Sequence, residues 1–387
     1  MHAPPDPASR FVVAIPACNE AARIESCLRA VSEQRGAQDG AHCDHILLLL
    51  NNCTDDTALV VERLRPDLAV PVTVITREFP AGMANAGHAR SEALALAVRI
   101  AGADGIVATT DADGVVARDW IACTRAAFAL GVDVVCGRAL IDPVEAMQIT
   151  AALHADDARE VAYGAMLDEI HGLVDPDPFD PLPRHAEHSG ASIATTVSAY
   201  YRAGGMPTLP TGEDRGFLLA LRAVDARIRH APDVHVTVSG RLQGRAAGGM
   251  ADTMARRMVR QDAMLDDQLE PALTCLRRAG LRASARAAWI GRLEPTSSWC
   301  ELVRILSREA ALPVEAVSAW LQTEYFGQAW TRIEASSPAL VRVPVVRATL
   351  DRHVAAAGRI LASLRSEMPT DAAGRADSHL DTELRSQ

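Results

Sequence analysis

The sequence lacks several patterns that would place a protein in a familiar class at once. No stretch reaches the ~18–20 continuous apolar residues of a membrane-spanning helix, so we expect no transmembrane segment. The eight cysteines never form a Cys-x-x-Cys pair, which favours free thiols in a reducing cytoplasm. The first six residues hold no basic segment followed by an apolar one, so we expect no signal peptide.

Three motifs of common enzyme classes are also absent. No Gly-x-Gly-x-x-Gly follows the first apolar run, and neither Gly-x-x-x-x-Gly-Lys-Ser/Thr nor Gly-x-Ser-x-Gly occurs in the chain. Positive charge is scarce: 39 Lys and Arg against 49 Asp and Glu leave a formal net charge of −10. An acidic balance argues against a nucleic-acid partner but permits a local basic pocket for phosphates.

The chain is long enough for more than one region. Its 387 residues exceed the roughly 250–300 at which one core stops growing, and 49% of them are hydrophobic. We expect an α/β domain over residues 1–249, a helical region over 250–367 and a polar, disordered tail over 368–387. The helical region is a candidate dimer surface, an acceptor lid or a support for the sheet.

Short β-rich runs alternate with helical patterns in the first part, which indicates a layered α/β fold. Strands are expected at residues 11–15, 46–50, 72–76, 106–110, 132–136 and 234–238. Asn19 and Thr54 are expected to cap the helices that follow the first two strands. The proline-rich stretch 171–188 is predicted to be a long loop.

Polar or Gly-rich segments follow each of the first four predicted strands, at residues 16–20, 51–57, 82–87 and 111–113. In open parallel sheets ligands bind beyond the carboxyl ends of the strands. We therefore expect these four segments to lie along one edge and to form the functional site.

Asp111-Ala112-Asp113 is the sharpest of the four segments. Two carboxylates at a spacing of two can face a hard divalent cation, and Mg²⁺ prefers one or two carboxylates together with substrate phosphates. Mg²⁺ or Mn²⁺ is therefore the predicted cofactor, as a Lewis acid on a leaving diphosphate. The alternative is an ordinary turn, which Asp also favours.

Gly190 and the pair Glu213-Asp214 are the next candidates. Asp214 is placed to take a proton from an acceptor hydroxyl, with Glu213 beside it as an acceptor contact. The alternative is that both acids merely offset the dipole of a helix that starts there.

Arg241 and Arg245 lie in a Gly-rich loop that can close on a diphosphate and neutralise its charge. The alternative is a solvated surface loop. His235 is a candidate third metal ligand, and Ser239 competes for that role. A histidine of an alternating strand is also compatible with a purely structural position.

The ordered set of segments resembles the family 2 glycosyltransferases of the GT-A fold. The motifs are residues 12–20, 51–57, 85–87, 111–113 and 212–214, and the resemblance covers about residues 11–249. It implies a Rossmann-like, mostly parallel sheet flanked by helices. It also implies an inverting, metal-dependent transfer of a sugar from a nucleoside-diphosphate sugar to an unidentified hydroxyl acceptor. Because the sequence has no membrane segment, we expect this acceptor to be soluble or small.

The resemblance also implies roles for individual residues. The substrate-binding set is Pro16, Ala17, Asn19, Glu20, Asn51, Asn85, Asp111, Ala112, Gly190, Arg241 and Arg245. Within it, Asn51 would lie at the base and Asp111 near the ribose, while Asp113 would chelate the metal and Asp214 would act as the base. The family often has an acidic residue that reads the base where Asn51-Asn52 stands. Because of this departure, uridine over guanosine is only a preference: a UDP-sugar is favoured and a GDP-sugar stays open.

Two other functions compete with sugar transfer. A nucleotidyltransferase of a related fold would need a Gly-rich basic loop after the first strand, and residues 16–20 contain neither Gly nor a basic residue. A non-catalytic sugar-nucleotide-binding protein would not need the acidic pairs at 111–113 and 213–214.

Overall fold

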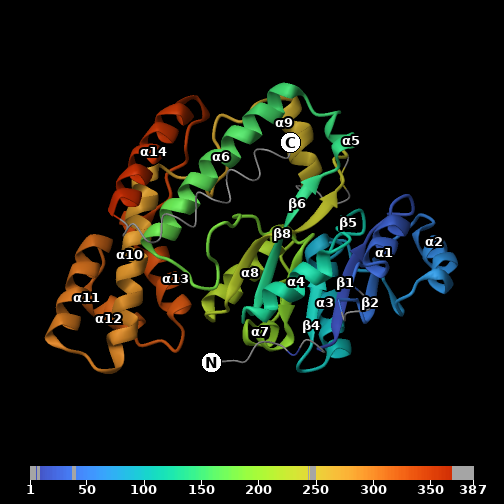
Figure 1. The fold of residues 1–387 in the computed structure, drawn as a ribbon, viewed down its shortest axis with the longest axis horizontal. Coiled ribbons are helices and arrows are strands. Elements are labelled where there is room, and N and C mark those ends of the chain that lie inside the picture. The colour runs from blue at the N-terminus through green and yellow to red at the C-terminus, as the bar shows by residue number, and fades with distance from the viewer. Residues whose placement is uncertain (1–5, 7–8, 37–40, 243, 245–249, 368–387) are drawn as a thin grey trace. The chain divides into compact units, whose positions relative to one another are not determined.

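The computed structural model describes residue 6 and residues 9–36, 41–242, 244 and 250–367. Arg245 and the predicted tail lie outside these residues. The strands are β1 (Phe11–Ala17), β2 (His45–Asn51), β3 (Val72–Arg77), β4 (Ile106–Thr109), β5 (Val115–Val116), β6 (Val134–Ile141), β7 (Ile193–Thr196) and β8 (Ile228–Val238). They form one sheet in the order β3-β2-β1-β4-β7-β6-β8-β5 (Figure 1).

The sheet is mixed. β1 pairs in parallel with β2 and β4, β2 with β3, and β6 with β8. β7 runs antiparallel to both β4 and β6, and β5 runs antiparallel to β8. Four of the seven pairings are therefore parallel, and the expected α/β fold with helices in the C-terminal part is confirmed.

Helices cover both faces of this sheet, which explains the continuous apolar runs of its central strands. They are α1 (Ile24–Ser32), α2 (Thr57–Leu64) and α4 (Trp120–Ala129) on one face, and α3 (Ala86–Ala101), α7 (Val197–Arg202) and α8 (Glu213–Ala223) on the other. In β1, Phe11, Val13 and Ile15 pack on the first face, while Val12 and Ala14 pack on the second.

Two predicted helix caps are wrong. α1 begins at Ile24 without a side-chain cap, and the Asn19 side chain instead accepts hydrogen bonds from the backbone after β2. α2 begins at Thr57, and Asp55 rather than Thr54 accepts the hydrogen bond from its first N–H group, at 3.0 Å. In both places the loops after β1 and β2 bind each other. A search for local helix caps does not detect contacts between two different loops.

Several elements are longer than expected or were not expected at all. The late strand β8 begins at Ile228 and β6 extends to Ile141. Helix α6 (Ala151–Val174) was missed because its apolar residues do not gather on one face, and it includes residues 171–174 of the predicted loop. The short elements β5, β7 and α5 (Pro143–Ala146) carry too few residues to show a period.

Contacts divide the chain into two compact units. Unit 1 consists of Met1–His154, Pro178–Gln261 and Thr323–Thr331, and unit 2 of Ala155–Asp177, Asp262–Gln322 and Arg332–Gln387. Unit 1 holds the whole sheet and also α9 (Met250–Val259). The domain boundaries at residues 249 and 367, which were inferred from the sequence, remain predictions.

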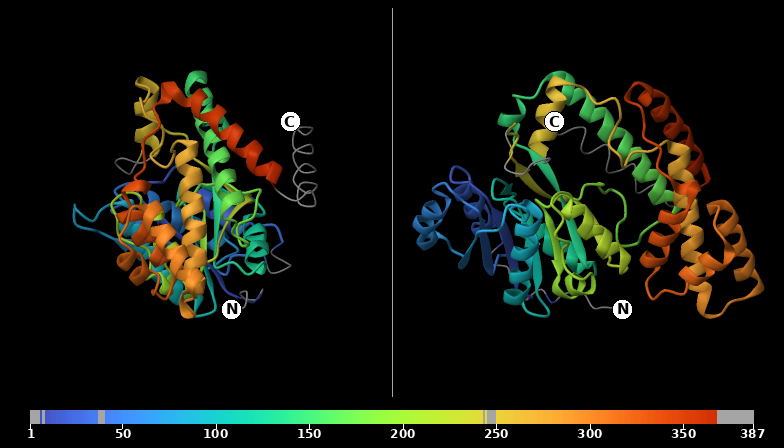
Figure 2. Two further views of the ribbon diagram at one scale, coloured as in Figure 1. Left: turned by 90° about the vertical axis from the view of Figure 1, so that its left-hand side faces the viewer. Right: turned by 180° about the vertical axis from the view of Figure 1, so that it is seen from behind.

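Unit 2 is helical in the part that the structure describes. Its complete helices are α10 (Ala272–Ile290), α11 (Ser297–Ala310), α12 (Val314–Trp320) and α14 (Leu350–Glu367), drawn in orange to red in Figure 2. It shares α6 and α13 (Phe326–Ser336) with unit 1. Its core joins α6, α10 and α14 through residues such as Tyr163, Cys275 and Leu361. None of the described helices has the length and apolar composition needed to cross a bilayer.

Candidate active site

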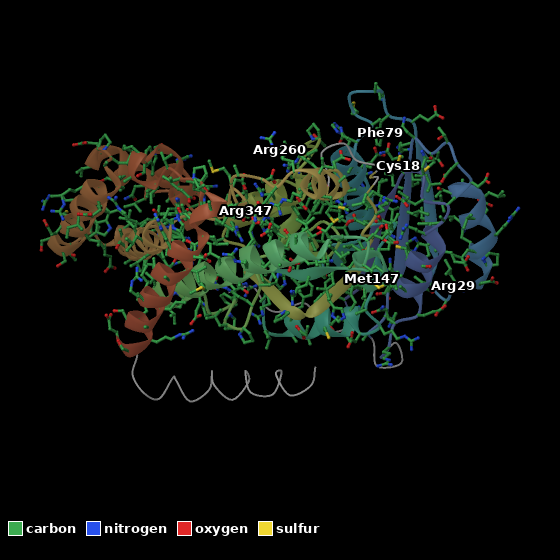
Figure 3. All side chains as sticks on the ribbon, turned by 90° about the horizontal axis from the view of Figure 1, so that it is seen from above. Cys18, Arg29, Phe79, Met147, Arg260 and Arg347 are labelled. Atoms are coloured by element: carbon green, nitrogen blue, oxygen red, sulfur yellow. The ribbon has the colours of Figure 1, made fainter. Side chains whose placement is uncertain are left out.

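The site lies where the order of the strands reverses. From β1 the chain continues outward to β2 and β3, and then returns to β4 on the other side of β1. The carboxyl ends of β1 and β4 are therefore neighbours at a topological switch point, the usual place of ligands in open sheets. Glu20 follows β1 there, and Asp111 and Asp113 follow β4. Cys18 and Phe79, labelled in Figure 3, come after β1 and β3 at this edge.

The loops after β1 and β2 are fixed to each other. Asn19 adopts a left-handed backbone conformation with φ of 57°, and its Oδ1 accepts hydrogen bonds from the N–H groups of Thr54 at 2.7 Å and Asp55 at 3.2 Å. The N–H of Glu20 donates to Thr57 Oγ1 at 2.9 Å. The structure therefore uses the Asn19 side chain to shape this wall of the site.

A second set of predicted residues lies at the ends of β2 and α3. Asn51 is only 4% exposed, and its Oδ1 has no hydrogen-bond partner among the described residues. Its Nδ2 lies 3.5 Å from the carbonyl of Asn85, whose side chain caps α3 by accepting from the His88 N–H at 3.0 Å. The neighbouring Asn52 holds the backbone of Phe79 with two hydrogen bonds of 3.0 Å.

Three further predicted residues can offer little more than backbone. The side chains of Ala17 and Ala112 are buried in the hydrophobic core, each 4% exposed. Pro16 is half-buried within β1, in register with Leu49 of β2. Any contact that Ala17 or Ala112 makes with a ligand therefore falls to its main chain.

Arg241 joins the two acidic segments. Its guanidinium forms two hydrogen bonds with the carboxylate of Glu20, at 2.9 and 2.6 Å, and lies 3.0 Å from Asp113 Oδ2. Burial, and then the neighbouring charge of Asp111, raise the pKa of Asp113 to about 6, although Arg241 opposes the shift. Ionised Asp113 is therefore short of positive charge even with Arg241 beside it.

Arg90 is the centre of the second half of the site, and the motifs did not reveal it. Its guanidinium donates to Asp111 Oδ1 at 2.5 Å, to Glu213 Oε1 at 3.1 Å, and to the Gly190 carbonyl and Thr109 Oγ1 at 2.9 Å each. Burial lowers the pKa of Arg90, but the two adjoining carboxylates outweigh it and raise the pKa. Arg90 thus ties the segment after β4 to the start of α8.

Gly190 and Asp214 complete this half. The Gly190 N–H donates to Asp214 Oδ2 at 3.0 Å, and Asp214 Oδ1 accepts from the Arg215 N–H at 2.7 Å. A Cβ atom on Gly190 would lie 2.8 Å from both Cζ and Nε of Arg90. Only glycine leaves room for the guanidinium here, so the position has a steric reason for its residue type.

Glu145 of α5 anchors the chain next to Arg241 and was not predicted. Its Oε2 accepts from Ser239 Oγ at 2.9 Å and from the Gly240 N–H at 2.6 Å, and its Oε1 pairs with Arg23 at 2.6 Å. The bond from Arg23 is the main reason that the pKa of Glu145 is lowered. The backbone leading into Arg241 is therefore held by a carboxylate of another element.

No three His, Cys, Asp or Glu side chains gather closely enough to hold a metal in the part of the chain that the structure describes. His235 is half-buried on β8, in register with Arg138, and is not gathered with Asp111 and Asp113 into such a group. The two aspartates still suit Mg²⁺ or Mn²⁺, because Mg²⁺ needs only one or two carboxylates where phosphates supply other ligands.

The charges around the two arginines support that fit. We call Glu20, Asp111, Asp113 and Glu213, with Arg90 and Arg241, the site cluster, since each carboxylate pairs with one of the two guanidiniums. Counted over these six described side chains alone, four carboxylates and two guanidiniums give a formal charge of −2. A divalent cation matches that charge.

A sequence signal for Arg90 does exist. Arg90, Leu94, Val98 and Ala101 recur at a spacing of three or four on α3, and all of them are buried. A charged residue on an otherwise apolar helical stripe needs partners, because a charge is rarely buried unpaired.

Comparisons with solved structures find weak likenesses to glycosyltransferases. A mannosyltransferase of Pyrobaculum calidifontis, in complex with GDP-Man and Mn²⁺, is 20% identical over 85% of this chain and 88% of its own, with a TM-score of 0.41. TarS residues 1–349 of S. aureus, in complex with UDP, are 14% identical over 93% of each chain, with a TM-score of 0.42. Glucosyl-3-phosphoglycerate synthase of Mycobacterium tuberculosis is 17% identical over 65% of this chain and 77% of its own, with a TM-score of 0.37.

The family assignment rests on sequence. No curated protein matches the chain. The model of glycosyl transferase family 2 matches residues 12–162, which include the segments after β1, β2, β3 and β4 but end before Gly190 and Glu213-Asp214. The resemblance drawn from the motifs is confirmed over residues 12–162, where the chain matches the model of glycosyl transferase family 2.

Proposed function

We propose that the protein transfers a sugar, with inversion, from a nucleoside-diphosphate sugar to a hydroxyl acceptor, in a site formed by its first 249 residues. The observation that carries the proposal is the site cluster at the switch point of the sheet, with its formal charge of −2. Besides burial, Asp111 and Glu20 both raise the pKa of Asp113 through their like charge, and a divalent cation bound at Asp113 would relieve this repulsion.

Asp113 and Asp111 would hold the divalent cation, Mg²⁺ or Mn²⁺. When bound, the ion supplies Lewis-acid stabilisation of the charge that develops on the leaving diphosphate. Arg241 is the described cation that can also reach such a diphosphate, since it already lies against Asp113 at 3.0 Å. Bidentate pairing of guanidinium with phosphate suits this role.

Asn51 would read the base of the donor. Its buried Oδ1 has no partner in the part of the chain that the structure describes, so a ligand N–H group at this place would satisfy it. A carboxamide offers one acceptor and one donor side by side, which complements the imide edge of uracil. Guanine presents two adjacent donors, which a carboxylate would suit better, so we propose a UDP-sugar as the donor.

Asp214 would act as the base, with Glu213 at its side. The acceptor hydroxyl transfers its proton to Asp214 while its oxygen forms a bond with the anomeric carbon and the nucleoside diphosphate leaves with the electron pair of the broken bond. The hydrogen bond from the Gly190 N–H orients Asp214 Oδ2, and Arg90 holds Glu213. The acceptor is a hydroxyl compound whose identity this geometry does not select.

The test measures thermal stability against UDP, GDP, ADP and CDP, each with and without Mn²⁺. A ligand that binds only the folded state raises the Tm by mass action. We expect the largest rise with UDP and Mn²⁺ together, and then turnover of a UDP-sugar in an acceptor screen. A folded protein whose Tm responds to no nucleotide would contradict the proposal, and release of pyrophosphate from a nucleoside triphosphate with a sugar phosphate would replace it by nucleotidyl transfer.

A further inference from the structure

Arg241 forms an ion pair with Asp113, the carboxylate that the proposed function assigns to the metal. Its guanidinium contacts both oxygens of Glu20 and also Asp113 Oδ2, 3.0 Å away. The side chains are largely buried, with 6% of Glu20, 16% of Asp113 and 21% of Arg241 exposed. Since water screens such a group poorly, the guanidinium and a divalent cation compete for the same negative charge.

The contact is built into the fold. Glu145 accepts hydrogen bonds from the Ser239 hydroxyl and the Gly240 N–H, and Ser239 Oγ in turn accepts a hydrogen bond from the Arg241 N–H at 3.2 Å. The long side chain of Arg241 therefore starts from a held position and ends on carboxylates of two other segments. Its alternative partner is a diphosphate, whose oxygens can also accept two hydrogen bonds from the planar guanidinium and which carries more negative charge.

Resting on the proposed function, we propose that Arg241 is a tethered counter-ion that occupies Asp113 until a nucleoside diphosphate draws the guanidinium onto its phosphates. Departure of Arg241 exposes Asp113 to the divalent cation. Nucleotide and metal then bind cooperatively, because each favours the arrangement in which Arg241 has left the carboxylate.

The experiment measures Mn²⁺ binding by the electron paramagnetic resonance signal of free Mn²⁺, with and without UDP. It compares the wild-type protein with Arg241→Gln and with Arg29→Gln. Arg29 is a matched control, because it forms an exposed ion pair with Glu25 on α1 (Figure 3) and loses the same charge. We expect Arg241→Gln to bind Mn²⁺ alone at least about fivefold more tightly than wild type, the lower end of typical coupling between sites.

The same variant should bind UDP more weakly, while Arg29→Gln follows the wild type in both titrations. Arg241→Gln removes the guanidinium that pairs with the buried carboxylate of Glu20. The double variant Glu20→Gln/Arg241→Gln is therefore compared with Glu20→Gln, because neither of these two proteins carries the Glu20 charge. In that pair, too, loss of Arg241 should tighten the binding of Mn²⁺ alone.

Equal affinity for Mn²⁺ alone in wild type and Arg241→Gln, with Mn²⁺ and UDP still binding together, would overturn the counter-ion role and leave the proposed function intact. Absence of Mn²⁺ binding under every condition would overturn both. The nucleotide titration therefore separates the two failures.

Discussion

Both units contain ion pairs between Arg and largely buried acidic side chains, but the site cluster of unit 1 and the three groups of ion pairs in unit 2 differ in charge balance. In unit 2, Glu160, Asp175, Glu270 and Glu334 pair with Arg278, Arg282, Arg286 and Arg347. Four carboxylates thus meet four guanidiniums, and Arg342 lies 3.7 Å from Glu270 as a fifth. In the site cluster of unit 1, the same number of carboxylates meets two guanidiniums.

On the proposed function, the difference separates charges that hold a fold together from charges that would bind a ligand. Glu270 is 3% exposed, and each of its carboxylate oxygens accepts a hydrogen bond from Arg278 at 2.8 Å. Its negative charge is therefore balanced by a guanidinium of the protein. Asp113 shares Arg241 with Glu20, and its pKa rises to about 6 as a result of burial and of Asp111. Buried ion pairs occur in both units, so the imbalance, rather than the burial of charge, marks the functional site.

The largest predicted effect comes from removing the least compensated charge. Asp113→Asn should lower kcat/KM by about a hundredfold or more, since metal stabilisation of the leaving group contributes several kcal/mol. Asp119→Asn, a change at an exposed aspartate before α4, is the matched control and should keep full activity. Turnover of Asp113→Asn at the wild-type rate would exclude the metal role.

The pH dependence of the Tm of Asp113→Asn tests whether the negative charge of Asp113 destabilises the folded protein. The pKa of Asp113 is about 6 in the folded protein against an ordinary 3.8, so the folded state binds more protons between these values and ionisation weakens it. Relative to wild type, Asp113→Asn should therefore gain a few °C in Tm above pH of about 6, and the gain should vanish below pH of about 4. A Tm difference that is constant with pH would contradict this origin.

Arg90 and Arg278 provide the next contrast, because both are buried and pair with two carboxylates. Replacing either by Met removes the guanidinium that pairs with one buried and one partly exposed carboxylate, and should cost about 3–5 kcal/mol of stability. The lysine variants keep the charge and separate the two roles. Arg90→Lys should lower kcat about tenfold or more, because one ammonium cannot hold Asp111 and Glu213 in the geometry of a planar fork, whereas Arg278→Lys should change only the Tm.

The measurements are kcat, KM and the affinity for UDP with Mn²⁺, each taken on variants shown to be folded. Equal losses of kcat in Arg90→Lys and Arg278→Lys would mean that Arg90 supports the fold alone.

Sequence reasoning succeeded where the physical signal is local. Strands β1, β2 and β4 are apolar throughout because both of their faces are covered, and a run of this kind predicts a buried strand without knowledge of its neighbours. The acidic segment at residues 111–113 directly follows β4, so its place at the end of a strand can be predicted once the strand is recognised.

The remaining features depend on contacts between distant residues. Arg241 meets Glu20 across 221 positions of the chain, so no local pattern shows that it neutralises carboxylates of the site. Asn19 is of a residue type that often caps helices, but its side chain binds the loop after β2. Its partner lies 35 residues away, so the local sequence cannot show which of these two roles it takes. Arg90 was missed because a basic residue on a helix is usually solvated, although the buried stripe beneath it argues otherwise.

The smallest effects are expected at two glycines, one in each unit. Gly190→Ala would place its Cβ 2.8 Å from the Arg90 guanidinium, which four hydrogen bonds hold in place, so we expect a loss of about 1–3 kcal/mol together with a lower kcat. Gly280, within α10, has open space at its Cβ, and Gly280→Ala should instead gain about 0.5–1 kcal/mol. Urea denaturation of both variants measures the two signs. A stabilised Gly190→Ala with normal turnover would show that Arg90 has room to move, and that the site cluster is held less firmly than the ion pairs of unit 2.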